Sequence, residues 1–308
     1  MLRKGDLTQG GITGTLLHFT LPMMVGSFLQ QCYNIADTLI VGQCIGAGAL
    51  AAVGSAYTLM VFLISVLLGL AMGSGTVFSL HYGAGNYVAL RRSIFSSFVL
   101  IGIVTLILNV AVFIWLDPIL RLLQVPQDIY GMMRSYLWII FCGIVFTFIY
   151  NFYASLLRAV GDSVTPLWFL AVSVVLNIAL DLFFILQLDW GIQGAAAATV
   201  LAQGVAALGI IIYTYRRRPE LRWHHEDMCF DRTCLKEIAS FSTLTCVQQS
   251  VMNLGILMIQ GLVNSFGTAV MAAFAAAVKI DSFAYMPVKE FGNAFSTFIA
   301  QNFGAGRY

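Results

Sequence analysis

Long apolar runs constrain this chain more than any other feature of its sequence. A helix that crosses a bilayer needs about 20 mostly apolar residues, whereas the strands of a membrane barrel show about ten residues of alternating hydrophobicity. Eight runs have the length and uniformity expected of helices: Leu16–Val41, Val53–Leu80, Ser93–Leu116, Ser135–Leu157, Leu167–Leu188, Gly194–Tyr215, Ile238–Ser265 and Val270–Phe303. We therefore predict an all-α, polytopic membrane protein.

The composition supports this prediction. Charged residues make up 10% of the chain, against about 25% in soluble domains. The lipid bilayer is thus the expected surrounding of nearly the whole chain, and no nucleic-acid partner is expected.

An internal repeat divides the chain. Residues 45–87 align without a gap to residues 266–308 at a constant offset of 221, and both copies end on a Gly-Ala-Gly turn. In an apolar chain, such a repeat is typical of transporters built from two homologous halves. We expect a six-helix N-lobe (residues 1–215), a cytoplasmic linker (216–237) and a partial C-lobe (238–308) that holds helices seven and eight only.

Basic residues predict the orientation of the helices. If the N-terminus is cytoplasmic, twelve of the sixteen Lys and Arg residues fall on the inner side, and only Arg121 and Arg134 fall in outer loops. Cytoplasmic loops carry the excess of basic residues in membrane proteins. The inner residues are Arg3, Lys4, Arg91, Arg92, Arg158, Arg216, Arg217, Arg218, Arg222, Arg232, Lys236 and Arg307.

Four polar residues fall at one depth of the N-lobe. At 1.5 Å per residue, Asp37, Asp181 and Thr199 lie about 7, 10 and 8 Å inside the outer ends of their helices. Asn177 lies one turn from Asp181 on the same helix face. Oxygens of these types can coordinate Na⁺, and a buried carboxylate readily takes up H⁺. We predict a cation site at these four residues; the alternative is that the two carboxylates only cap or bridge helices.

Other polar residues within the spans form candidate walls of a substrate path. In span one, polar side chains recur on one face, and the same holds in span seven; a charged pair lies in span eight. These groups could line a path for an organic cation, or they could form only inter-helix hydrogen bonds. They are Gln30, Tyr33, Asn34, Gln248, Gln249, Asn253, Lys279 and Asp281.

The remaining polar groups do not indicate an enzyme. His224, His225, Cys229 and Cys234 lie in the linker region, but their spacing is not that of a structural zinc site. No His, Cys and Asp constellation has catalytic spacing. We expect no cofactor and no metal beyond a coupling ion.

Several motifs together resemble the multidrug and toxic compound extrusion (MATE) family of transporters. Their order and spacing cover nearly the whole chain, although no single motif is decisive. The matching stretches are Leu21-Pro22, Asp37–Gly42, Gly83–Asn86, Leu157–Pro166, Asn177–Asp181, Gly191–Thr199 and Ala300–Gly306.

The resemblance implies twelve helices in two lobes and export of lipophilic organic cations in exchange for Na⁺ or H⁺. The bacterial family members carry an N-lobe cation site that maps onto Asp37, Asn177, Asp181 and Thr199. Span seven lacks the carboxylate of one subgroup, so this chain is similar to the subgroups that rely on the N-lobe. Spans nine to twelve are missing, which indicates a C-terminally truncated member. We expect a bacterial or archaeal plasma membrane location and, for the full-length protein, a monomer.

Two alternatives remain at this point. A lipid-linked oligosaccharide flippase of the same superfamily would need basic residues for a pyrophosphate headgroup, and the first six spans carry none within their apolar stretches. A truncated, non-transporting fragment is the second alternative.

Overall fold

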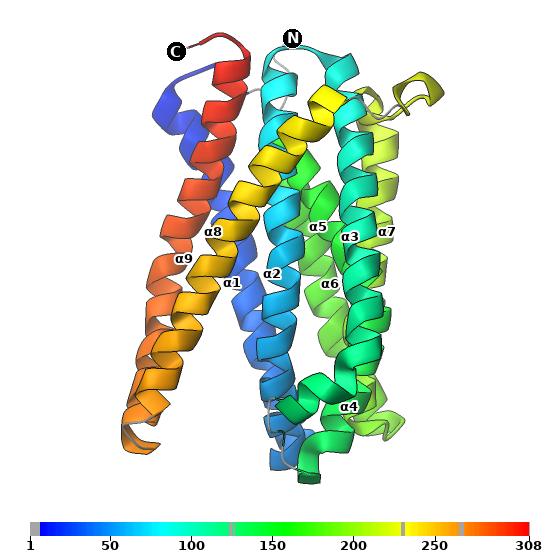
Figure 1. The fold of residues 1–308 in the computed structure, drawn as a ribbon, viewed down its shortest axis with the longest axis vertical. Coiled ribbons are helices and arrows are strands. Elements are labelled where there is room, and N and C mark those ends of the chain that lie inside the picture. Colours follow the sequence, from blue (N-terminus) through cyan, green and yellow to red (C-terminus); the bar gives the residue numbers. More distant parts are fainter. Residues whose placement is uncertain (1–6, 123–124, 126, 229–231, 265–267, 308) are drawn as a thin grey trace.

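The computed structural model describes residues 7–122, 125, 127–228, 232–264 and 268–307. Within this range, side chains are described except at 55, 58, 62, 122, 225, 232–233, 250, 252–254, 256–258 and 260–282. The described elements are all helical (Figure 1). The α-helices are α1 (Ile12–Cys44), α2 (Ala47–Gly83), α3 (Tyr87–Leu122), α4 (Gln127–Cys142), α5 (Ile144–Ala159), α6 (Val164–Leu182), α7 (Gly191–Arg217), α8 (Arg232–Asn264) and α9 (Thr268–Gly304).

Six membrane crossings account for the helices from α1 to α7. By length and composition, α1, α2, α3, α6 and α7 can each span a bilayer, and α4 with α5 passes the same test as one span bent by 48°. The bend falls at Gly143, where an added Cβ would lie 2.5 Å from Val200 of α7. Glycine therefore lets α7 approach the broken span closely. That α8 and α9 also cross the membrane stays a prediction.

The outer surfaces of the helices suit lipid. Large apolar side chains point outward, such as Val175, which is 70% exposed, and Trp168, which is 67% exposed. Inside, aromatic rings of α2, α3 and α5 pack together: Phe152 makes edge contacts with Phe78 and Phe98. Water would penalise such an exterior, whereas lipid does not.

The internal repeat appears in the structure as two matching helix ends. At the end of α2, the amides of Ala84, Gly85 and Asn86 bond to the carbonyls of Leu80, Tyr82 and His81. At the end of α9, the residues 221 positions later make the same three bonds. Gly85 and Gly306 adopt φ of +68° and +69°, values that favour glycine. This is the hydrogen-bond pattern that terminates helices with a left-handed residue.

The two matching helix ends also touch one another. An added Cβ at Gly83 would overlap the carbonyl of Gln301, and one at Gly304 would overlap the carbonyl of Leu80. Gly83 and Gly304 are related by the offset of 221, and so are Leu80 and Gln301. The contact is therefore symmetric about the axis that relates the repeats. Only glycine permits backbones to come this close.

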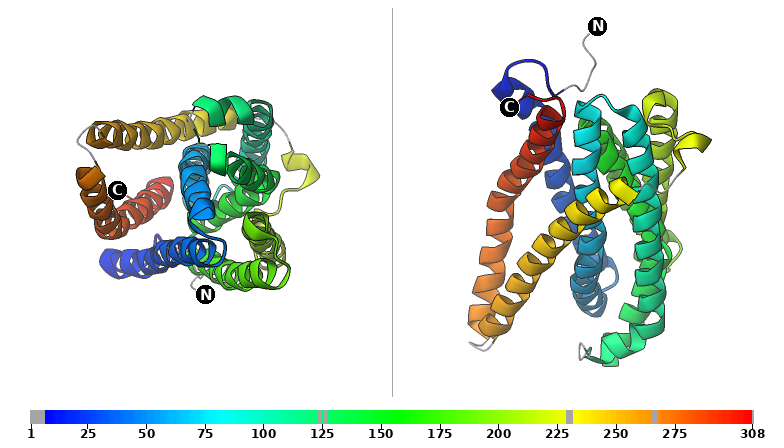
Figure 2. Two further views of the ribbon diagram at one scale, coloured as in Figure 1. Left: turned by 90° about the horizontal axis from the view of Figure 1, so that it is seen from below. Right: turned by 45° about the horizontal axis from the view of Figure 1, so that its top comes forward.

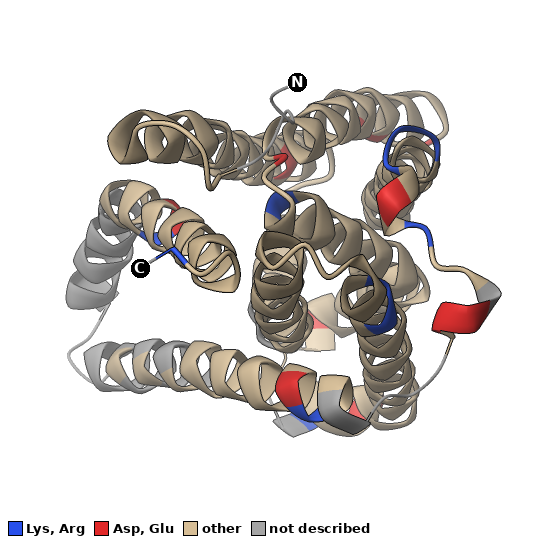
Figure 3. Cartoon of the chain, turned by 90° about the horizontal axis from the view of Figure 1, so that it is seen from above, with Lys and Arg blue, Asp and Glu red and all other residues tan. Residues whose placement is uncertain are grey.

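The last two helices meet the N-lobe at the end where both termini lie. Near that end α8 crosses α2, with an ion pair of 3.4 Å between His81 and Glu237. Leu16 and Phe19 of α1 pack with Ala294 and Phe298 of α9. Towards the opposite end, α8 and α9 diverge from α2 (Figures 1 and 2). Viewed onto the end that holds the termini, basic residues surround the helix ends (Figure 3).

The segment between α7 and α8 is folded against the N-lobe. Asp227 accepts a hydrogen bond of 2.6 Å from Arg91 of α3. The Trp223 ring makes edge contacts with Phe95 and Phe98 of α3. Leu221 is buried. The described part of the predicted linker is thus anchored to α3 through Asp227 and Trp223.

Candidate functional site

The structure brings the four predicted cation-site residues together from three helices. Asp37 comes from α1, Asn177 and Asp181 from α6, and Thr199 from α7. All four are buried, and Asp181 has no exposed surface. Helices α1, α6 and α7 pack side by side at this level, so residues far apart in sequence share one polar cluster inside an apolar bundle.

Hydrogen bonds order the cluster around Asn177. The amide is best satisfied with its nitrogen donating to the Asp181 carboxylate at 3.0 Å. Its oxygen then accepts from the backbone amide of Thr199 at 3.1 Å and from the Thr199 hydroxyl at 3.3 Å. Asn177 therefore ties α6 to α7 beside the carboxylate.

Two carboxylate oxygens in this cluster lack a protein donor. Oδ1 of Asp37 and Oδ1 of Asp181 are both buried and find no hydrogen-bond partner within the described part of the chain. The two carboxyl groups are close enough to interact electrostatically. Burying two such groups without compensation is costly, and a shared proton or a bound cation removes the cost. The donor set, all oxygen, fits Na⁺ as well as H⁺.

Two tyrosines join the cluster. The Tyr33 hydroxyl lies 3.3 Å from the Thr199 hydroxyl, so Tyr33 belongs here rather than only to a substrate path. Tyr136 of α4 is 5% exposed and lies within electrostatic range of Asp37, Asp181 and Tyr33. The sequence analysis missed Tyr136, because no motif marks it and its position depends on how α4 rotates about its own axis.

Comparison with known proteins identifies the family and the fold. The MatE family model matches residues 22–183 and 245–308. The chain belongs to the MATE family. It is 33% identical over 312 residues to the probable multidrug resistance protein YpnP of Bacillus subtilis, covering 99% of this chain and 68% of that protein. It is 29% identical to the probable multidrug resistance protein YoeA of Bacillus subtilis, covering 94% of this chain and 64% of that protein.

Solved structures share the fold. An outward-facing multidrug resistance MATE family transporter of the MOP superfamily superposes with a TM-score of 0.92 and 23% identity, covering 99% of this chain and 68% of that one. The chain thus spans about two thirds of the length of its relatives. It is a multi-pass membrane protein of a multidrug efflux transporter family, which is not a family of enzymes.

The predicted substrate-path residues are only partly placed in this MATE fold. Gln30 and Gln248 are exposed, and Gln249 is half-buried. Asn34 donates to Gln31 at 3.2 Å within α1. The side chains of Asn253, Lys279 and Asp281 lie outside the described residues, so their role stays a prediction.

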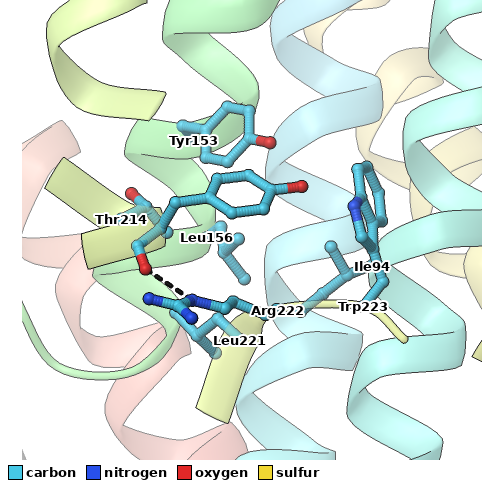
Figure 4. A pocket seen from close by; sticks show the side chains of 8 residues that line it. Ile94, Tyr153, Leu156, Thr214, Leu221, Arg222 and Trp223 are labelled. Atoms are coloured by element: carbon cyan, nitrogen blue, oxygen red, sulfur yellow. Dashed lines mark hydrogen bonds between the residues drawn. The ribbon is translucent and has the colours of Figure 1, made fainter. Parts of the chain in front are cut away.

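Two cavities border the N-lobe. An open pocket of ≈ 510 Å³ is lined by Ile139, Asp189, Trp190, Gln193 and Ala197, at the start of α7. The second, of ≈ 10 Å³, lies between α3, α5, α7 and the linker, and has room for about one water molecule. There Arg222 donates to the backbone oxygen of Tyr215 at 2.5 Å beside Tyr153 and Trp223 (Figure 4). The linker packs closely on the lobe around the second cavity, which is too small for a drug-sized molecule.

The linker histidines and cysteines do not form a described metal site. Cys229 and the side chain of His225 lie outside the described residues, Cys234 is buried and His224 is exposed. Among described side chains, no group of three or more His, Cys, Asp or Glu residues could hold a metal ion.

Proposed function

We propose that this chain is the cation-coupled part of a MATE antiporter that exports lipophilic organic cations in exchange for Na⁺ or H⁺. The observation that carries the proposal is the pair of buried, partnerless oxygens, Asp37 Oδ1 and Asp181 Oδ1. Ionisable groups inside a membrane are costly and mark ion pathways. The coupling ion binds between α1 and α6 and draws the two helices together; its release lets them separate.

Asn177 and Thr199 are the residues that distinguish the two ions. Proton uptake needs only the carboxylates. Na⁺ needs further oxygen ligands, which the Thr199 hydroxyl and the Asn177 amide oxygen can supply. With the amide nitrogen turned to Asp181, the amide must rotate by half a turn before its oxygen can face a cation beside Asp181.

We further propose the arrangement of the protein in its membrane. Residues 1–215 form the N-lobe, 216–237 the cytoplasmic linker and 238–308 the start of the C-lobe, with the N-terminus cytoplasmic and the protein in a prokaryotic plasma membrane. The helix ends rich in basic residues support this orientation. The lipid-linked oligosaccharide flippase is the weaker candidate, because the first six spans carry no basic residue within their apolar stretches.

The test is ethidium efflux from cells expressing the chain and its Asp37→Asn, Asp181→Asn double variant. We expect efflux above background that is lost in the double variant, while membrane levels of the protein stay equal. Asp189→Asn, which removes an exposed carboxylate, is the matched control and should export normally. An imposed Na⁺ gradient at constant pH, and a pH gradient without Na⁺, then identify the ion.

Equal efflux by the wild type and the double variant would refute a coupling role for these carboxylates. Background accumulation in both would show that the chain does not transport by itself, and the same pair of variants should then be compared in a version extended to twelve helices.

A further inference from the structure

A third buried carboxylate lies where the two lobes meet. Glu290 of α9 is 8% exposed, and its Oε1 accepts a hydrogen bond of 2.8 Å from the hydroxyl of Ser27 on α1. Ser27 is its hydrogen-bond partner within the described part of the chain, where no basic side chain forms an ion pair with it. A single hydroxyl is weak compensation for a carboxylate inside a membrane.

Both partners lie well inside the predicted spans. Ser27 is 15 residues from the start of α1, and Glu290 is 14 residues from the end of α9, which places them about 22 and 21 Å from the helix ends that lie with the termini. Asp37 lies ten residues further along α1, about 15 Å away along the helix axis. Glu290 is therefore separate from the coupling-ion cluster, although both touch α1.

The seam between α1 and α9 changes character at Glu290. On the side of the termini, Met23, Ala294 and Phe298 belong to one buried apolar cluster. On the other side, the rings of Phe28 and Phe283 meet edge to face with centroids 6.3 Å apart. These rings are 54% and 41% exposed, and beyond them the helices diverge (Figures 1 and 2). Glu290 thus lies where the packed part of the seam gives way to the part in which α1 and α9 diverge.

We propose that Glu290 is the counter-ion of the transported organic cation, with Phe28 and Phe283 as the aromatic surfaces that receive its apolar groups. A carboxylate on a seam that also carries two exposed aromatic rings matches a lipophilic cation, because the carboxylate attracts its charge and the faces of aromatic rings attract cations. Ser27 holds the carboxylate when the cation is absent and is displaced when it binds. This assignment rests on the proposed function, since it names the residue that binds the exported substrate.

The test measures binding to the full chain in lipid nanodiscs, without any ion gradient. Radiolabelled tetraphenylphosphonium is the cationic probe, and triphenylphosphine oxide is its neutral counterpart. Glu290→Gln keeps an oxygen acceptor for Ser27, so the fold should persist. We expect at least tenfold weaker binding of the cation and less than twofold change for the neutral compound. Glu290→Asp should retain most of the affinity.

Two variants serve as controls. Glu237→Gln removes a carboxylate near the start of α8 that pairs with His81, and it should bind tetraphenylphosphonium like the wild type. Ser27→Ala should bind it equally or more tightly, because no hydroxyl competes for Glu290. Thermal unfolding of each variant checks the fold.

Three outcomes would overturn the assignment: wild-type affinity in Glu290→Gln, equal weakening for the cation and the neutral compound, or no cation binding by the wild type. The result is independent of ion coupling. If the Asp37 and Asp181 variants leave efflux intact while Glu290→Gln loses cation binding, the coupling proposal fails and the assignment of Glu290 stands.

Discussion

At the scale of single residues, the cation cluster depends on groups that serve two purposes. Thr199 contacts Asn177 through its hydroxyl and its backbone amide, and the carbonyl of Ala195, 3.1 Å from the hydroxyl, is the alternative acceptor for its single proton. A hydroxyl that positions the amide bonded to Asp181 is a candidate ligand and a candidate support. The two roles predict different effects of substituting Thr199 on cation binding and on folding.

Thr199→Val should weaken cation binding with little effect on folding. Valine keeps the shape of threonine but removes the hydroxyl, whereas Thr199→Ser keeps the oxygen. If Na⁺ is the coupling ion, we expect the concentration of Na⁺ that half-saturates binding to rise about tenfold in the valine variant, a loss of about 1.4 kcal/mol, and to stay near the wild-type value in the serine variant. Na⁺-induced thermal stabilisation measures this, and equal values in both variants would contradict a ligand role for the hydroxyl.

Asp227 offers a prediction in the linker, outside the membrane. Burial alone would raise its pKa, but hydrogen bonds from Arg91 and from the His224 amide outweigh that effect and hold the pKa below its usual value. A lowered pKa means that the charged form stabilises the fold. This stabilisation is complete above the pKa of the unfolded state, about 3.9, and is lost as the pH falls through the lower pKa of the folded state.

Asp227→Asn should therefore lower the melting temperature at pH 6 to 7, and the difference from the wild type should shrink at pH values below about 4. At neutral pH trypsin should also cleave the variant faster at Arg222, because the linker loses its hydrogen bond to Arg91 of α3. Asp189→Asn, at an exposed carboxylate, should do neither. A melting difference that is constant with pH would show that Asp227 acts through packing alone.

At the scale of helices, close approach decides the arrangement of the lobes. The backbone of α2 meets α8 at Gly73, where an added Cβ would lie 2.6 Å from the backbone nitrogen of Ser242, and meets α9 at Gly83. One helix thus forms both of these close backbone contacts, and the second contact is symmetric about the axis that relates the repeats. Packing of this kind, rather than hydrophobic exclusion, holds helices together in lipid.

Gly83→Ala and Gly304→Ala should destabilise the protein to a similar extent, by about 1–3 kcal/mol each, since overpacking forces the backbones apart. Gly54→Ala in α2 and Gly292→Ala in α9 are matched controls, because nothing lies within 4 Å of the added Cβ. There alanine should be neutral or stabilising by up to about 1 kcal/mol. Thermal unfolding in detergent measures all four; the same sign at all four positions would refute the close contact.

At the scale of the whole molecule, charge and symmetry act together. Most of the basic residues lie on the side of the molecule that holds the chain termini. On this side lie the ends of α2, α5, α7 and α9 and the starts of α3, α6 and α8. An odd number of crossings between equivalent residues of the two copies would give the copies opposite orientations. The matching ends of α2 and α9 instead lie side by side, which requires an even number of crossings between them. The predicted spans α3, α4–α5, α6, α7, α8 and α9 make six.

A fusion experiment tests the resulting orientation. Green fluorescent protein at the C-terminus should fluoresce, since that terminus is predicted to be cytoplasmic, and alkaline phosphatase inserted after Asp189 should be active outside. The reciprocal fusions, with alkaline phosphatase at the C-terminus and green fluorescent protein after Asp189, should both be silent. The opposite pattern would invert the proposed topology and place the cation cluster at the cytoplasmic end.

The sequence by itself determined the properties that depend on position along one helix. Run length predicted the spans, and depth arithmetic predicted a common depth for Asp37, Asn177, Asp181 and Thr199. The orientation given by the basic residues stays a prediction. The constant offset of 221 predicted the repeat. Each of these follows from distance along a chain whose helices cross a slab of fixed thickness, so no knowledge of packing was needed.

Only the tertiary structure decided which faces of the helices meet. It added Tyr136 and Tyr33 to the cluster, paired Glu290 with Ser27, and set Gly83 against Gln301. It also showed the linker anchored by Asp227. The physical reason is that lipid and the protein interior are both apolar, so a spanning helix carries little amphipathic signal to fix its rotation. Side-chain packing sets that rotation, and packing is a property of the assembled bundle.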